Sequence, residues 1–177
     1  MDKQATLQRW LEEAAAAEAR LAPAGVTPPD VRAGMSGLEL LQGIASGTLP
    51  RNAMAATLNV IPITMEAGLL VYQATATPAH YNLSGTAHGG WVATVLDTCV
   101  SSVVLSLLPA GKAYTTIELK VNYMRAITED TGPVRAEGQA IHVGGRIGTA
   151  EGRLLDAAGK LYAHAITTCL IFDAASS

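Results

Sequence analysis

The segment from residue 91 to residue 108, WVATVLDTCVSSVVLSLL, constrains the fold more than any other part of the chain. It is almost wholly apolar, but it contains one carboxylate, Asp97. In a membrane-spanning helix, that carboxylate would cost about 3 kcal/mol on insertion scales. We therefore interpret the segment as a buried helix of a soluble domain. A single helix this apolar needs a sheet wrapped around it.

The helix has two unlike faces when its residues are placed at roughly 100° intervals. One face carries Val92, Val95, Leu96, Cys99, Val100, Val103 and Leu107. The other carries Ala93, Thr94, Asp97, Thr98 and Ser101. The simplest interpretation of Asp97 is an ordinary aspartate on a wet face. The absence of any other charge in the helix favours a cleft or a subunit interface instead, because a wet face normally carries several charged residues.

The region before this helix is predicted to be helical at first. Residues 4–21 are rich in alanine and predict a helix, which the Pro/Gly linker 22–30 ends. Ser36 and Glu39 form a capping-box pattern at the start of a second short helix, residues 36–46.

Strand-like patterns flank the apolar helix on both sides. Residues 53–78 predict two strands around the turn Glu66-Ala67-Gly68, and the segment TTIELKVNYMRA alternates with period two after the helix. Three further strands are predicted at 134–142, 147–155 and 161–172. The fold class is therefore α+β, with a sheet around one long central helix. We divide the chain into an N-terminal helical extension, residues 1–50, and a main domain, residues 51–177.

Composition excludes several functions and suggests an oligomer. With 12 basic residues and a net charge of -3, the chain lacks the basic surface that nucleic acids require. Charged residues make up only 15% of the chain, which suggests that some surface is buried between subunits. The four histidines show no metal-ligand spacing. Two distant cysteines in apolar stretches and an N-terminus unlike a signal peptide predict reduced thiols and a cytoplasmic location.

A glycine-rich turn, YNLSGTAHGG, precedes the helix and places Gly89 and Gly90 at its start. The first backbone N–H groups of a helix have no internal partner, and glycine lets a ligand approach them closely. Such donors can stabilise an oxyanion by about 3 kcal/mol each. Together with the carboxylate of Asp97, they suggest acyl-transfer chemistry. The alternative is that these glycines merely form a tight turn.

The combined spacing of Asn82, His88-Gly89-Gly90 and Asp97 resembles the hotdog-fold acyl-CoA thioesterases of the phenylacetate-degradation (PaaI) type. The strand TTIELKVNYMRA adds to the resemblance, which covers about residues 53–172. It implies a hotdog fold, in which an antiparallel sheet wraps the central helix. It also implies hydrolysis of an acyl- or aryl-CoA to the free acid and coenzyme A.

The resemblance assigns roles to individual residues. Gly89 matches the backbone donor to the thioester carbonyl, and Asp97 matches the nucleophile or general base. Asn82 matches a residue that places water or the carbonyl. Thr116 matches a hydroxyl near the thioester, although Thr115 is an alternative.

Further substrate contacts are expected from His88, Gly90, Arg146 and Arg125. His88 can instead bond across the turn. Arginines suit the phosphates of coenzyme A, but surface arginines are commonly just solvated.

The resemblance also implies a homodimer with shared active sites, and a homotetramer of such dimers. Asn82 and Gly89 would come from one subunit, and Asp97 and Thr116 from its partner. No metal or redox cofactor is expected, with coenzyme A entering only as part of the substrate. The alternatives are a non-hydrolytic acyl-CoA-binding hotdog protein and, less favoured, a hotdog dehydratase. The scarcity of aromatic residues slightly favours an aliphatic acyl pocket.

Overall fold

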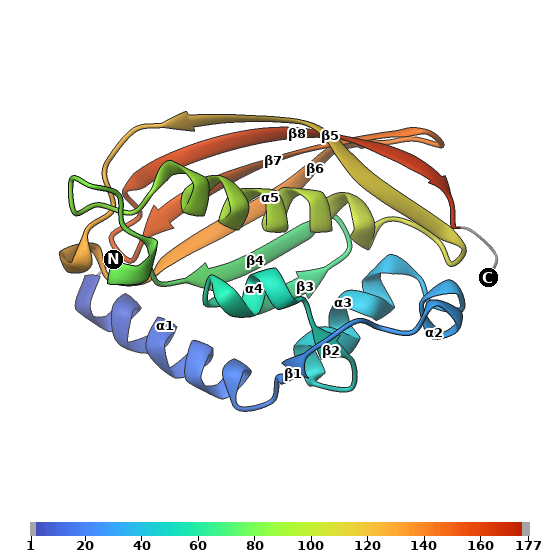
Figure 1. Cartoon of the computed structure of the whole chain (residues 1–177), viewed down its shortest axis with the longest axis horizontal. Coiled ribbons are helices and arrows are strands. Elements are labelled where there is room, and N and C mark those ends of the chain that lie inside the picture. The colour runs from blue at the N-terminus through green and yellow to red at the C-terminus, as the bar shows by residue number, and fades with distance from the viewer. Residues whose placement is uncertain (1–2, 175–177) are drawn as a thin grey trace.

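A six-stranded sheet curls around one long helix, α5 (Gly89–Ser106), in the computed structural model, which describes residues 3–174 (Figure 1). The strands lie in the order β3-β4-β6-β7-β8-β5, and all neighbouring pairs are antiparallel. Their bounds are β3 Val60–Glu66, β4 Leu69–Ala74, β5 Lys112–Tyr123, β6 Val134–Val143, β7 Ile147–Asp156 and β8 Leu161–Asp173. Both ends of the sheet, β3 and β5, are therefore edge strands.

The inner face of the sheet is shaped to receive α5. A Cβ atom on Gly148 would lie 2.4 Å from Val104 Cγ1, and one on Gly152 would lie 2.6 Å from Val100 Cγ1. These distances are shorter than van der Waals contact, so the helix packs this closely only because both positions are glycine. Within residues 3–174, no helix has both the length and the apolarity that crossing a membrane needs.

The N-terminal region adds several short elements beside the β3–β4 end of the sheet (Figure 1). They are α1 (Lys3–Glu18), β1 (Ala22–Ala24), α2 (Pro29–Ala33), α3 (Gly37–Ser46), β2 (Pro50–Arg51) and α4 (Ala53–Thr57). Helix α1 packs on β3, and α3 packs on both α5 and β3. Two 3₁₀ turns, Pro78–His80 and Glu129–Thr131, occur in later connections. The boundary at residue 50 remains a prediction.

Most of the predicted elements are present. The capping box of Ser36 and Glu39 is formed, and Gly68 turns β3 into β4 with a φ of 77°. Residues 53–57, however, were expected to open a strand and instead form α4. Asn52 explains the difference, because its Oδ1 accepts from the N–H groups of Met54 and Ala55 and so caps a helix.

Two residues of the helical wheel are also corrected. Leu107 was placed on the core face but is 40% exposed, because α5 ends at Ser106 and Leu107 follows as its C-cap. Ser101 was placed on the open face but is buried.

A β-bulge in β5 changes which of its residues face the helix. The pairing of β5 with β8 passes from Thr116 to Glu118, which leaves Ile117 unpaired and 57% exposed. Before the bulge, Thr116 faces α5; after it, Leu119 and Val121 pack on the core. The period-two alternation of TTIELKVNYMRA would place Thr116 on the same polar face as Glu118. The extra residue in the bulge exchanges the inward-facing and outward-facing positions of the strand on its two sides, so Thr116 faces inward.

Candidate active site

The first turn of α5 leaves one backbone donor unused. His88 is the N-cap, and its Nδ1 accepts a hydrogen bond of 2.9 Å from the Gly90 N–H. This bond confirms the alternative for His88, a contact across the turn, and it occupies the Gly90 donor that had been considered for substrate. The Gly89 N–H has no acceptor among residues 3–174. Gly89 is thus the position where an incoming oxygen finds a free helix N-terminal donor.

The end of β5 braces this turn from the other side. The Tyr123 hydroxyl donates to the Gly89 carbonyl at 3.1 Å. Sequence reasoning missed this contact, because Tyr123 and Gly89 are 34 residues apart. A cleft of about 320 Å³ opens here, lined by Ala87, Gly89, Val92, Tyr123, Met124, Arg125, Ala126 and Ile127. The free donor of Gly89 therefore borders space that a ligand can enter.

Asp97 lies two turns further along α5 and is half-buried. Its Oδ1 accepts one hydrogen bond, from the Thr116 hydroxyl at 3.2 Å, and no basic side chain in the described part of the chain forms an ion pair with it. Burial raises the pKa of the Asp97 carboxyl, and the bond from Thr116 lowers it by a smaller amount. Thr115, the alternative to Thr116, is exposed. The geometry therefore selects Thr116 as the neighbour of Asp97.

Gly89 and Asp97 of one chain are too far apart to act on one carbonyl group. Eight residues separate them on the same helix, which corresponds to about 12 Å along the axis. A reacting carbonyl must lie within about 3 Å of both its donor and its attacking oxygen. Gly89 and Asp97 of the same chain therefore cannot both contact one carbonyl group.

Asn82 is used by its own loop. Its Oδ1 accepts from the N–H groups of Ser84 and Thr86, and its Nδ2 donates to the Thr86 hydroxyl at 3.0 Å. The side chain thereby fixes the turn that leads into α5. The predicted contact of Asn82 with water or with the thioester carbonyl remains a prediction.

The two candidate arginines lie in different places. Arg125 lines the cleft beside Gly89, and its Nη1 donates to the Leu161 carbonyl. Arg146 is exposed in the hairpin between β6 and β7, and it lines neither of the clefts that border the start of α5. The structure thus brings Arg125, but not Arg146, to Gly89 of the same chain.

A second cleft, of about 330 Å³, lies at the start of α5 and is lined partly by α4. Its lining comprises Met54, Leu58, Ala79, His80, Tyr81, His88, Gly90, Trp91 and Thr94. The rings of His80 and Trp91 stack there with centroids 5.8 Å apart. The sequence did not predict this cleft, because its walls come from three separate segments, residues 54–58, 79–81 and 88–94. Although aromatic residues are few, four ring-bearing side chains line it, those of His80, Tyr81, His88 and Trp91.

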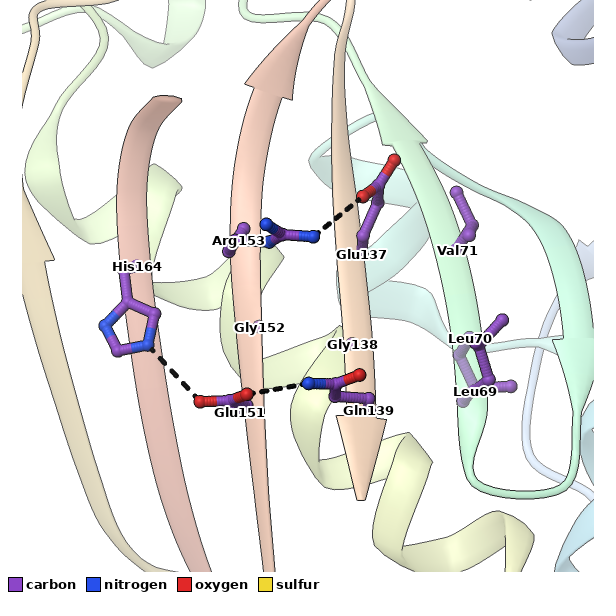
Figure 2. Close-up of a pocket in the computed structure, with 10 residues that line it drawn as sticks. All are labelled: Leu69, Leu70, Val71, Glu137, Gly138, Gln139, Glu151, Gly152, Arg153 and His164. Carbon is purple, nitrogen blue, oxygen red and sulfur yellow. Dashed lines mark hydrogen bonds and ion pairs between the residues drawn. The ribbon is translucent and has the colours of Figure 1, made fainter. Parts of the chain in front are cut away.

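A larger hollow of about 460 Å³ lies on the face of the sheet that points away from α5 (Figure 2). Polar side chains cross it, and Glu151 contacts both Gln139, at 2.7 Å, and His164, at 3.8 Å. Arg153 and Glu137 form a further ion pair at 3.8 Å. None of the residues predicted for the active site lines this hollow. Its size alone therefore does not make it the reaction site.

Comparisons with known proteins agree with this fold. Residues 84–163, which include Gly89, Asp97 and Thr116, match the model of the thioesterase superfamily. Comparison with curated protein sequences gives no significant match.

Solved structures show the same architecture. A phenylacetic acid degradation-related protein from Ralstonia eutropha is 27% identical, with a TM-score of 0.66 over 76% of this chain and 98% of its own. The E. coli PaaI protein is 20% identical, with a TM-score of 0.68 over 80% of this chain and 100% of its own. A Streptococcus mutans protein bound to acetyl CoA is 20% identical, with a TM-score of 0.60 over 67% of this chain and 92% of its own.

The class of protein follows from these findings. The sheet wrapped around α5 is the hotdog fold, and the predicted resemblance to PaaI-type proteins is confirmed. Residues 84–163 are similar to the thioesterase superfamily, and this similarity indicates a thioester hydrolase.

Proposed function

We propose that this protein hydrolyses acyl-CoA thioesters in a site shared by two copies of the chain. The observation that carries the proposal is the half-buried Asp97 carboxylate on the helix whose first N–H, that of Gly89, has no acceptor within the described part of the chain. A carboxylate and an oxyanion donor are the two groups that thioester hydrolysis needs. The similar fold of the Streptococcus mutans protein bound to acetyl CoA supports this substrate class.

The separation of Gly89 and Asp97 supports catalysis in trans. Strand β5 is an edge strand of 12 residues, with Ile117 and Tyr123 exposed along it. A long, exposed edge of this kind is suited to pairing with another strand. If two copies pair through β5, the Gly89 donor of one copy can meet Asp97 and Thr116 of the other. We extend the proposal to a homodimer, and to a homotetramer of such dimers.

In the proposed reaction, Asp97 attacks the thioester carbonyl or activates a water molecule that does so. The carbonyl oxygen gains negative charge and is stabilised by the Gly89 N–H. The carbon–sulfur bond then breaks, and coenzyme A leaves as the thiolate and takes up a proton. If Asp97 is the nucleophile, the acyl group is left on its carboxylate as an anhydride, which water hydrolyses to the free acid and restored Asp97. If Asp97 is the base, the attacking water has already supplied the acid's oxygen, and its proton passes by way of Asp97 to the departing thiolate. A raised pKa makes Asp97 a stronger base than an exposed carboxylate. No step requires a metal or redox cofactor.

The two clefts at the start of α5 suggest where the two ends of the substrate bind. We place the coenzyme A side near Arg125, whose guanidinium suits a phosphate. Arg146 is proposed to reach coenzyme A from a neighbouring copy. We place the acyl group near His80 and Trp91, where both aliphatic and aryl groups find apolar walls. Since acyl-CoA and reduced cysteines are typical of the cytoplasm, we keep that location as part of the proposal.

The first experiment measures release of free thiol from short, medium, long and aryl acyl-CoAs. Gly89→Pro removes the proposed donor, while Gly89→Ala keeps it and is the matched control. Proline is favoured at the first position of a helix, and His88 already has the extended ψ of 139° that a following proline prefers. We expect about a hundredfold loss for proline and little loss for alanine. Tight acyl-CoA binding without thiol release would instead support the non-hydrolytic alternative.

Mixing two inactive variants tests the shared site. Asp97→Asn and Gly89→Pro are each expected to be inactive as homodimers. After exchange of subunits, about a quarter of the wild-type activity should return, because half of the dimers are mixed and one of their two sites is intact. No recovery, despite mixed dimers detected by mass spectrometry, would show that both residues act within one chain.

A further inference from the structure

A cleft of about 450 Å³ lies between α1 and β3, away from the residues of the proposed active site. We call it the Arg-lined cleft, and it is lined by Arg9, Glu13, Ala16, Ala17, Arg20, Ile63, Thr64 and Arg135. Four of these residues lie in α1: Arg9, Glu13, Ala16 and Ala17. Their successive spacings of four, three and one place them on one face of the helix. The two alanines leave room beside the arginines.

The charge of the Arg-lined cleft opposes that of the chain. Three arginines line it against one carboxylate, Glu13, whereas the chain as a whole carries a net charge of -3. Several guanidinium groups around one cleft, with few carboxylates beside them, favour binding of an anion. Phosphate suits them in particular, because the planar N–H donors of arginine match the spacing of phosphate oxygens.

Arg135 is held in place before any ligand arrives. It is 8% exposed, its Nε donates to Gln73 Oε1 at 3.0 Å, and its Nη2 donates to Glu13 Oε2 at 2.6 Å. Its guanidinium carbon also lies 4.4 Å from the centre of the Trp10 ring. The remaining nitrogen, Nη1, has no acceptor among residues 3–174. Arg135 therefore offers fixed N–H groups to the cleft at little cost in side-chain entropy.

Arg9 and Arg20 supply adjustable charge at the two ends of the cleft. Both are exposed, and the contact of Arg9 with Glu13 is long, at 3.9 Å. Arg20 makes no ion pair within the described residues. Arg20 lies two residues after the end of α1, and the nine-residue separation from Arg9 to Glu18 within the helix spans about 14 Å. Each side chain can reach several ångströms toward the centre. That spacing suits a ligand with more than one phosphate group.

We propose that the Arg-lined cleft binds a phosphorylated small molecule through Arg9, Arg20 and Arg135 Nη1. The phosphates could be supplied by coenzyme A itself or by an independent nucleotide, since both present the same chemistry. This site belongs to the junction between the N-terminal extension and the sheet. It does not depend on the proposed thioesterase mechanism.

The test uses the full-length protein with pyrophosphate, ATP and coenzyme A as separate probes in calorimetry at low salt. Arg20→Gln should weaken pyrophosphate binding by about tenfold or more, and added salt should weaken it further. Arg153→Gln is the matched control, because Arg153 is likewise exposed and forms a long ion pair of 3.8 Å elsewhere. Absence of binding by all three probes, or an equal loss in the control, would overturn the proposal.

The two tryptophans of the chain locate the binding. Trp10 packs on Arg135, whereas Trp91 lies in α5. In ¹H–¹⁵N spectra, pyrophosphate should shift the indole signal of Trp10 and leave that of Trp91 unchanged. A Trp10 shift with ATP as well as coenzyme A indicates a general phosphate site, whereas a shift with coenzyme A alone assigns the cleft to the substrate. A shift of Trp91 alone would contradict the proposal.

Discussion

Asp97 in α5 and Asp156 at the end of β7 are both withdrawn from solvent, but they are held in opposite ways. Asp156 is 4% exposed, and its Oδ1 accepts from the N–H groups of Ala158 and Lys160, each at 2.9 Å. Its Oδ2 accepts from the Tyr162 hydroxyl at 3.3 Å. Asp97 accepts one hydrogen bond in the described structure, from Thr116. Both oxygens of Asp156 therefore accept hydrogen bonds, whereas within the described residues Asp97 keeps lone pairs without a donor.

This difference separates a structural carboxylate from a reactive one. The backbone donors of Ala158 and Lys160 fix the turn between β7 and β8, because each bond to Asp156 orders a part of the backbone. Asp97 orders no backbone, and burial raises its pKa without a compensating charge. A carboxylate kept under-coordinated is poorly suited to stabilising a fold and well suited to attack or proton abstraction.

The largest expected effect is on the rate of hydrolysis in Asp97→Asn. Replacing the carboxylate by an amide removes the base or nucleophile, so the rate of thiol release should fall by about a thousandfold or more. Thermal unfolding should show no loss of stability, because asparagine fills the same space without a desolvated charge. A loss of less than about tenfold in a folded protein would remove Asp97 from the mechanism.

Asp156→Asn should show the reverse pattern. An amide cannot accept all the hydrogen bonds now made, so the free energy of unfolding should fall by about 2 kcal/mol in chemical denaturation. The rate per folded molecule should stay near that of the wild type. If Asp156→Asn lowers the rate while stability is unchanged, the contrast between the two aspartates is wrong.

Thr116→Val should sharpen the comparison by leaving Asp97 without its hydrogen bond. We expect about a tenfold loss of rate, because Thr116 holds the Asp97 carboxylate in one orientation and a misplaced reacting group slows the reaction. The acidic limb of the pH–rate profile should also move to higher pH, because Thr116 lowers the pKa of Asp97. Thr115→Val is the control, with an exposed hydroxyl one residue earlier. Equal effects of the two substitutions would exclude a specific role for Thr116.

The smallest effect concerns the dependence of stability on pH. Because the pKa of Asp97 is raised in the folded state, the folded protein binds that proton more tightly than the unfolded chain does. Above the ordinary carboxyl pKa of about 4, the free energy of unfolding therefore decreases as pH rises through the raised pKa. The melting temperature of Asp97→Asn minus that of the wild type should be larger at pH 7 than at pH 4. A difference that does not change with pH would contradict the raised pKa.

The sequence predicted the fold through signals that are local. Period-two alternation gave the strands after the helix, the apolar run gave α5, and Ser36 with Glu39 gave a helix start. The site residues Asp97 and Gly89 were likewise identified from their own surroundings. Leu107 was misplaced because a wheel does not indicate where a helix ends, and residues 53–57 because the cap at Asn52 was not recognised.

What the sequence determined by itself is the helix, the glycine at its start and the carboxylate two turns later, because each depends on neighbours within a few residues. The tertiary structure decided which partners meet them. The bulge at Ile117 turns Thr116 toward Asp97, and Tyr123 reaches Gly89 across 34 residues. Likewise, Arg135 finds Glu13 across 122 residues. Strand register and long-range packing set these contacts, and neither leaves a periodic signal in the chain.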